Sequence, residues 1–164
     1  MADGVEFSIT GLDSLLGKLD AVSYDIRRRG GRSALRKAAQ VVVQKAKEGA
    51  EGIDDPVTRA HIAENITLRW SSRRFKATGD LMFRVGVMGG AGGKASGDQY
   101  AGLPGGDTRH WRHVEFGTED TAAHPFMRNA LANSINEVTN TFVTEYEKAI
   151  DRAIRRAAKK AASS

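Results

Sequence analysis

Cysteine is absent from this chain of 164 residues, and proline occurs only three times. Without cysteine there is no disulfide framework, no thiolate zinc site, no iron–sulfur cluster and no cysteine nucleophile. No apolar run approaches the roughly 20 residues that cross a bilayer, so we expect no membrane partner. The first ten residues have neither a basic start nor an apolar core, and we expect no signal peptide. These absences exclude much redox and covalent chemistry and fit a reducing compartment.

The residues that are present indicate a folded domain with a small excess of positive charge. Hydrophobic residues make up 40% and charged residues 27% of the chain, which is typical of globular proteins. The length suffices for one buried core, so we expect a single domain over residues 1–164. The formal net charge of +5 favours a polyanion as a partner without requiring one.

Hydrophobic periodicity predicts an α+β fold. Alternating residues predict short strands, apolar residues at helical spacing predict helices, and Gly30-Gly31 separates the first two helices as a stop signal. The predicted strands cover residues 5–10, 65–71, 81–88 and 110–116, and the predicted helices cover residues 12–28, 33–51 and about 125–160. We expect a small, mostly antiparallel sheet of about four strands, packed against two N-terminal helices and one long C-terminal helix.

The C-terminal helix is long for a domain of this size. About 35 residues at ~1.5 Å each give a length of roughly 52 Å. A compact chain of this length has a diameter of only about 40 Å. The helix therefore either extends beyond its own domain, where a neighbouring subunit could cover its apolar stripe, or is kinked or frayed at one end.

Residues 89–106 are rich in glycine, and we expect them to form a flexible surface loop. The run from Gly89 to Ser96 superficially resembles the phosphate-binding pattern GxxxxGK[ST], but Met88 and Ala95 stand where the first glycine and the hydroxyl belong. We therefore expect no nucleotide and consider the loop a candidate interface. Its candidate contact residues are Gly89, Gly93, Lys94, Tyr100 and Pro104.

No pattern in the sequence indicates an active site. The motifs GxSxG and SxxK are absent, and Asp54-Asp55 before Pro56 is better explained as a helix start than as a catalytic pair. His113, Glu115 and His124 could bind a metal ion or move protons if the fold brought them together, but no ligand-like spacing supports this. We expect no enzyme, no cofactor and no metal.

Basic residues gather in two main clusters that could contact phosphates. No helix–turn–helix, zinc finger or aromatic stacking platform accompanies them, and a solvated helix face is the simpler explanation. Non-specific DNA binding through these helix faces stays an alternative function. The candidate contacts are Arg27, Arg28, Arg29 and Arg32 in the first cluster and Arg152, Arg155, Arg156, Lys159 and Lys160 in the second, while Arg69, Arg73, Arg74 and Lys76 form a weaker group.

The most specific pattern lies between Val114 and Leu131. Glu115-Phe116-Gly117-Thr118 ends a predicted strand, and His124-Pro125-Phe126 begins the long helix. This resembles the tail-component family of long-tailed bacteriophages, which includes the minor tail protein Z-like tail-completion proteins and has a similar signature before its C-terminal helix. The start from Phe7 to Leu16, the alanine-rich second helix and Val85-Gly86-Val87 are similar too, whereas Arg59 stands where the family often has glycine.

The same residues predict a structural corner on physical grounds. Gly117 permits a sharp or left-handed turn, and Thr118 can hydrogen-bond its local backbone. Pro125 is suited to starting a helix, and Phe126 would anchor that helix on the sheet. We expect Glu115 and His124 to be the exposed members, and therefore the candidate contacts.

The resemblance implies a structural protein of the virion neck, at the head-proximal end of the tail, assembled in the cytoplasm of a host bacterium. Such proteins complete the tail and help to join it to the head. The resemblance further implies a homo-oligomeric ring, sixfold like the tail tube. The implied partners are a tail terminator or tail tube protein and the head–tail connector proteins, with non-specific contact to phage DNA as a further expectation. Within the family, a tail terminator that caps the tube is the alternative.

Overall fold

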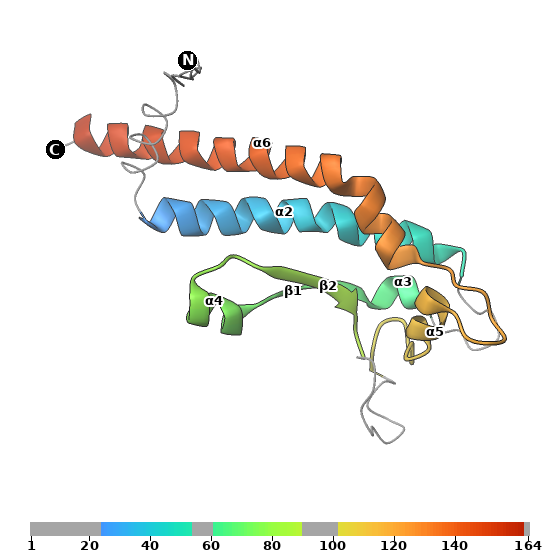
Figure 1. The fold of residues 1–164 in the computed structure, drawn as a ribbon. Coiled ribbons are helices and arrows are strands. Elements are labelled where there is room, and N and C mark those ends of the chain that lie inside the picture. Colours follow the sequence, from blue (N-terminus) through green and yellow to red (C-terminus); the bar gives the residue numbers. More distant parts are fainter. Residues whose placement is uncertain (1–23, 54–60, 90–101, 163–164) are drawn as a thin grey trace, which may run out of the picture.

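The computed structural model describes residues 24–53, 61–89 and 102–162, and it arranges them in three layers (Figure 1). The long helix α6 (Phe126–Ala162) forms one outer layer, helix α2 (Tyr24–Glu51) lies in the middle, and a β-hairpin covers the opposite side of α2. The strands of the hairpin are β1 (Ile66–Trp70) and β2 (Phe83–Val87). The short helices are α3 (Ile62–Asn65), α4 (Ser72–Thr78) and α5 (Trp111–Phe116).

Helices α2 and α6 pack against each other in an antiparallel pair. Gly30, near the start of α2, faces Ala149 of α6, and Gly49, near the end of α2, faces Phe126 at the start of α6. Small side chains are buried at every fourth position of α2, which produces a low ridge that allows close packing. These residues are Ala34, Ala38, Val42, Ala46 and Ala50.

The predicted helix break at Gly30-Gly31 is wrong, because α2 continues through both glycines. A Cβ atom at Gly30 would lie 3.1 Å from Cβ of Ala149, and one at Gly31 would lie 2.9 Å from Cδ1 of Leu81. Both glycines therefore lie where another element comes close, although each costs about 1 kcal/mol in helix propensity. The predicted helices 12–28 and 33–51 are one helix from Tyr24 on, and residues 12–23 lie outside the described part of the chain.

The two predicted strands 65–71 and 81–88 and their antiparallel pairing are confirmed. The register pairs Ile66 with Val87 at one end and Trp70 with Phe83 at the other. Between the strands the predicted connection contains the short helix α4, which ends at Gly79 in a left-handed conformation with φ 79°. Only glycine adopts that conformation without strain, so Gly79 turns the chain back towards β2.

The hydrophobic core lies where α2 ends and α6 begins. Ile62 and Ile66 pack there with Val87 of the hairpin and Phe126 of α6, and all four are buried. Ala46, Ala50, Ala63 and Ala130 complete the buried cluster. Because half of these residues are alanines, the core is small, and it joins the ends of several elements rather than running the length of the layers.

The predicted strand at 110–116 is wrong, because these residues form helix α5 from Trp111 to Phe116. The inward-facing residues Trp111, Val114 and Glu115 are three and four positions apart, which is the period of a helix and not of a strand. The N–H of Gly117 donates to the carbonyl of His113 at 2.8 Å and ends the helix. Within the described residues the sheet has two strands instead of about four, and the predicted strand 5–10 lies outside them.

The predicted C-terminal helix is confirmed, and it bends after its first turns (Figure 1). The hydroxyl of Ser134 donates to the carbonyl of Ala130 at 2.6 Å, and such contacts often bend helices. Among the described residues, no helix is long and apolar enough to cross a membrane.

Candidate functional site

A buried carboxylate holds the start of α6. Glu115, at the end of α5, is only 1% exposed. Its Oε2 accepts a hydrogen bond from the backbone N–H of Met127 at 2.9 Å, and its Oε1 accepts one from the N–H of Arg128 at 3.0 Å. The guanidinium of Arg128 lies 3.1 Å from the same Oε1. The expectation that Glu115 is exposed is therefore wrong, because the carboxylate serves the first turn of the helix.

All four backbone N–H groups of the first turn of α6 find acceptors. The carboxylate of Glu115 accepts hydrogen bonds from the N–H groups of Met127 and Arg128. The N–H of Phe126 donates to the carbonyl of His124 at 2.9 Å, and the N–H of Asn129 donates to the carbonyl of Pro125 at 3.1 Å. The N–H groups of Phe126, Met127 and Arg128 precede the first i→i−4 bond of the helix, which Asn129 makes to Pro125, so these three must be satisfied from outside it. A negative charge at this end also interacts favourably with the helix dipole.

The connection from α5 to α6 is a hydrogen-bonded turn. Gly117 has φ 76°, and a Cβ atom there would lie 3.0 Å from the carbonyl oxygen of Thr121. The hydroxyl of Thr118 accepts the N–H of Thr121 at 3.1 Å, and the N–H of His124 donates to the carbonyl of Val114 at 2.7 Å. Phe126 is buried in the core, whereas Phe116 and the side chain of His124 are exposed.

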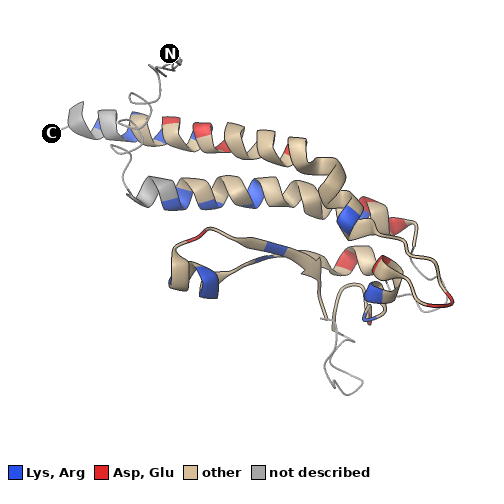
Figure 2. Ribbon diagram, in the orientation of Figure 1, with Lys and Arg blue, Asp and Glu red and all other residues tan. Residues whose placement is uncertain are grey.

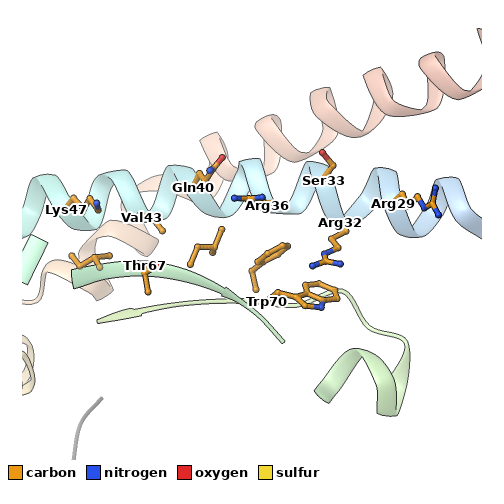
Figure 3. A pocket seen from close by; sticks show the side chains of 12 residues that line it. Arg29, Arg32, Ser33, Arg36, Gln40, Val43, Lys47, Thr67 and Trp70 are labelled. Carbon is orange, nitrogen blue, oxygen red and sulfur yellow. The ribbon is translucent and has the colours of Figure 1, made fainter. Parts of the chain in front are cut away.

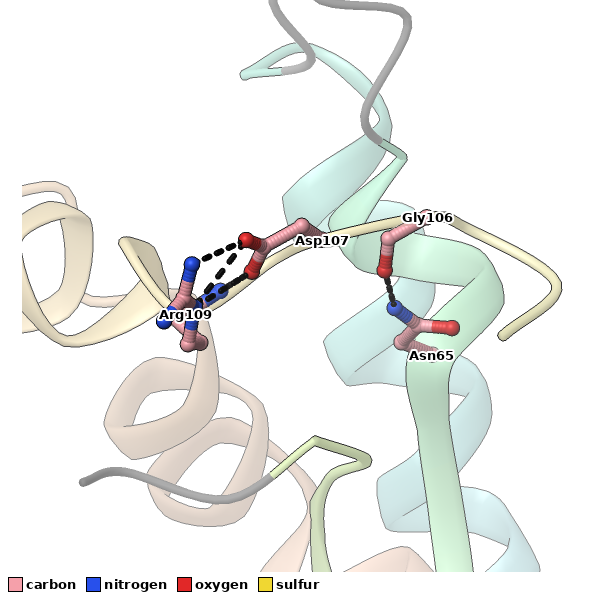
Figure 4. A network of polar contacts seen from close by, with 4 residues as sticks. All are labelled: Asn65, Gly106, Asp107 and Arg109. Carbon is pink, nitrogen blue, oxygen red and sulfur yellow. Dashed lines mark hydrogen bonds and ion pairs between the residues drawn. The ribbon is translucent and has the colours of Figure 1, made fainter. Parts of the chain in front are cut away.

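The end of the glycine-rich segment is fixed to α3 by Asn65 (Figure 4). The side chain of Asn65 is fully buried, accepts the N–H of Gly105 at 2.9 Å and donates to the carbonyl of Gly106 at 2.9 Å. It also donates to Oγ1 of Thr108 at 2.8 Å. Sequence reasoning missed Asn65, because a single asparagine carries no motif. Of the candidate loop contacts, Gly89 follows β2 with φ 92° and Pro104 is exposed, while Gly93, Lys94 and Tyr100 lie outside the described residues.

A basic groove lies between α2 and the hairpin (Figure 3). Its volume is about 680 Å³. Polar and charged side chains of α2 form one wall, and the hairpin forms the other with Leu68, Trp70 and Phe83. The residues from α2 include Arg29, Arg32, Arg36, Gln40 and Lys47.

Two arginines of the first predicted cluster lie on aromatic rings at the open end of this groove. The guanidinium of Arg32 lies 4.2 Å from the ring centroid of Trp70, and that of Arg28 lies 4.4 Å from the centroid of Phe75. Trp70 packs in turn against Phe75 and Phe83, with centroids 5.3 and 5.1 Å apart. These cations therefore help to attach the hairpin to α2, which is a structural use that the sequence reasoning did not foresee.

The two predicted basic clusters lie towards the same end of the helix pair, because α2 and α6 are antiparallel (Figure 2). Arg29 and Arg32 are exposed on α2 near its start. On α6 the exposed members are Arg152, Arg155, Arg156 and Lys159. The side chains of Arg27 and Lys160 lie outside the described part.

The candidate metal ligands do not come together in the described part of the chain. No group of three or more histidine and carboxylate side chains there could hold a metal ion. Glu115, one of the metal candidates, has both oxygens engaged at the start of α6, and His113 and His124 are exposed.

Apolar side chains are exposed along α6. Leu131 is 55% and Ile135 56% exposed, and they lie one helical turn apart. Val143 is 47% and Ile154 58% exposed further along the helix. Exposed apolar groups that gather on one element are typical of surfaces that bind another protein.

Comparison with known proteins gives one match. Residues 13–117 match the family described as "Bacteriophage HK97-gp10, putative tail-component". The matched segment includes Glu115-Phe116-Gly117 but ends before His124-Pro125-Phe126. No curated protein and no solved structure matches the chain. Because the match covers well over half of the sequence, the chain belongs to this family of bacteriophage tail components.

Proposed function

We propose that the protein is a structural component of the phage neck that completes the head-proximal end of the tail and helps to join it to the head. It does so as a homo-oligomeric ring, which the resemblance to tail-completion proteins implies to be sixfold. Family membership supports a role in the tail.

The observation that carries the ring proposal is the apolar surface of α6. Leu131 and Ile135 each expose more than half of their area, although a monomer would gain by burying them. Gly30 of α2 contacts Ala149 of α6. Beyond this contact α6 extends to Ala162, whereas the described part of α2 extends only to Tyr24. A neighbouring subunit that packs on this helix would cover side chains that the described fold leaves in water.

Complementation of incomplete tails tests the proposal. Tails assembled without this protein are mixed with filled heads and purified protein, and infectious particles are counted. We expect the wild-type protein to restore infectivity and L131E/I135E to restore less than about a tenth of it, because burying two carboxylates in an apolar contact is strongly unfavourable. Electron microscopy of the joined particles should place the protein in a ring at the head-proximal end of the tail.

The matched control is N140E/T144E, which introduces the same charges at the same spacing on exposed polar positions of α6. It should restore infectivity to the wild-type level. If the wild-type protein restores nothing, the neck function is wrong. If L131E/I135E is as active as the control, the neck function stands but α6 is not the contact between subunits.

A further inference from the structure

We propose that the outward face of the β-hairpin, together with α4, binds the phosphate backbone of duplex DNA without sequence preference. The contacts are Arg69 on β1, Arg84 on β2, and Arg73 and Lys76 on α4, and all four side chains are exposed. The inference depends on the hairpin alone and holds whether or not α6 forms a ring. It also moves the DNA contact from the helix faces that the sequence favours to a different layer of the fold.

The first support is the concentration of charge in this segment. Residues 66–87 contain Arg69, Arg73, Arg74, Lys76 and Arg84 but a single acid, Asp80. The segment therefore has a formal charge of +4, while the whole chain has +5. Arg74 lies 3.3 Å from Asp80, so this acid is already engaged and the other four cations gain nothing from it. Figure 2 shows blue segments, which mark Lys and Arg, on α4 and on the strands of the hairpin.

The second support is the register of the hairpin. Arg69 and Arg84 stand directly opposite each other on adjacent strands. Within the described residues, neither side chain has an ion pair or a hydrogen bond, and the ion pair of the hairpin region joins Arg74 to Asp80. Like charges in directly opposed positions destabilise a sheet. A bound anion would remove this repulsion, and a phosphate group suits two neighbouring guanidinium groups because it accepts bidentate hydrogen bonds.

The third support is the lining of the hollow beside the arginine pair. The aromatic residues Trp70 and Phe83 line the groove on the side of α2. On the outward face, Thr67 and Gly86 adjoin the arginine pair, and the apolar side chains of Met88 and Leu103 line the same hollow beyond them. Among the described residues, no aromatic side chain lines this hollow. Aromatic residues are the usual energetic centres of protein interfaces, whereas contacts to the DNA backbone are polar and hydrated, so the face favours DNA over an acidic protein.

The position of the hairpin is also suited to a duplex. The hairpin lies on the side of α2 opposite α6, with α4 at its tip (Figure 1). DNA on the hairpin and a protein on the exposed apolar residues of α6 would therefore occupy opposite sides of the molecule.

The experiment measures binding of the full chain to a fluorescent duplex of arbitrary sequence by anisotropy, at about 50 mM and about 200 mM salt. Four phosphate contacts predict that the association constant falls roughly 100-fold over this range. In R69Q/R84Q two contacts remain, and the fall should shrink to roughly 10-fold. The control R155Q/R156Q removes the same charge from exposed positions on α6 and should keep the wild-type salt dependence.

Several outcomes would overturn the inference. These are no binding at the lower salt, an unchanged salt dependence in R69Q/R84Q, or an equal loss in R155Q/R156Q. If polyglutamate of matched charge binds as tightly as the duplex, the face takes an acidic protein and the assignment to DNA is wrong. Circular dichroism checks the fold of each variant. If R69Q/R84Q does not fold, R73Q/K76Q on α4 replaces it in the test, and this variant must show the same reduced salt dependence.

Discussion

Replacing Glu115 with alanine is the most direct test of the corner between α5 and α6. The carboxylate is 1% exposed and accepts the backbone N–H groups of Met127 and Arg128 at 2.9 and 3.0 Å. Alanine removes both acceptors and leaves two donors at the helix start without partners. It removes no large apolar contact, so the expected loss comes from hydrogen bonding and from the helix dipole.

The magnitude follows from these contacts. A hydrogen bond to a charged group contributes about 1.5–3 kcal/mol, and loss of a helix cap costs about 0.5–2 kcal/mol. The ion pair with Arg128 adds under about 1 kcal/mol because that side chain is 57% exposed. Water can reach part of the first turn from that side, so we expect E115A to lower the free energy of unfolding by about 3 kcal/mol. For a chain of this length, that corresponds to a fall in Tm of roughly 6–12 °C.

Urea unfolding followed by far-UV circular dichroism measures the change, with E115Q and R128A as comparisons. Glutamine keeps one acceptor oxygen, so E115Q should lose about half as much as E115A. R128A removes the partner but leaves both backbone bonds of Glu115, and it should cost about 1 kcal/mol. A loss under about 1 kcal/mol in E115A, or an equal loss in R128A, would refute the assignment of Glu115 as the cap.

Two further predictions concern the contacts around α3 and between α2 and α6. In G105A the new Cβ atom would overlap the carbonyl oxygen of His61, so the segment must move, and urea unfolding should show a loss of about 3 kcal/mol. Hydrogen bonds from Lys37, and to a smaller extent from Lys148, lower the pKa of Glu145. The ionised carboxylate therefore stabilises the fold fully above the ordinary carboxyl pKa of about 4.3. This stabilisation is lost as the pH falls through the lowered pKa. Between about pH 5 and about pH 3 the wild type should therefore lose more stability than E145Q in the same denaturation assay, and equal losses would contradict this linkage.

The elements with a long, clear period were predictable from the sequence. The apolar stripe of α6 and the alternation in both strands of the hairpin gave the right element in each case. The prediction of a strand at 110–116 failed because the element is short. Over six residues, apolar Trp111, Val114 and Phe116 satisfy a helical and an alternating pattern almost equally well. The packing of Trp111 and Val114 at the edge of the core decides for the helix, and the core residues that they contact are distant in the sequence.

The corner was predictable in position but not in chemistry. Glycine and proline mark the turn, because their backbone preferences are local. The role of Glu115 depends on α5 ending so that its carboxylate meets the start of α6, eleven or more residues later. The same holds for Asn65, whose partners Gly105, Gly106 and Thr108 lie about forty positions away. A polar residue that is buried by distant backbone leaves no signal in a single sequence.

Gly30 and Gly31 show how a local signal can mislead and give a last test. In a continuous helix, alanine in place of glycine gains about 1 kcal/mol of helix propensity. At Gly31 the nearest atom to the new Cβ is Cδ1 of Leu81, the end of a flexible side chain that can turn away. At Gly30 it is Cβ of Ala149, which moves only with the backbone of α6, and such overpacking costs about 1–3 kcal/mol.

We therefore expect G31A to raise the free energy of unfolding by up to about 1 kcal/mol and G30A to lower it by about 1 kcal/mol. Urea denaturation of both variants decides between two accounts of the pair. If both stabilise the protein equally, α6 does not approach α2 as closely as the contact with Ala149 requires. If both destabilise it by more than about 2 kcal/mol, the glycines end a helix as their pattern indicates, and α2 is not continuous. Only the opposite signs fit a continuous helix in which one of the two glycines maintains the contact between the layers.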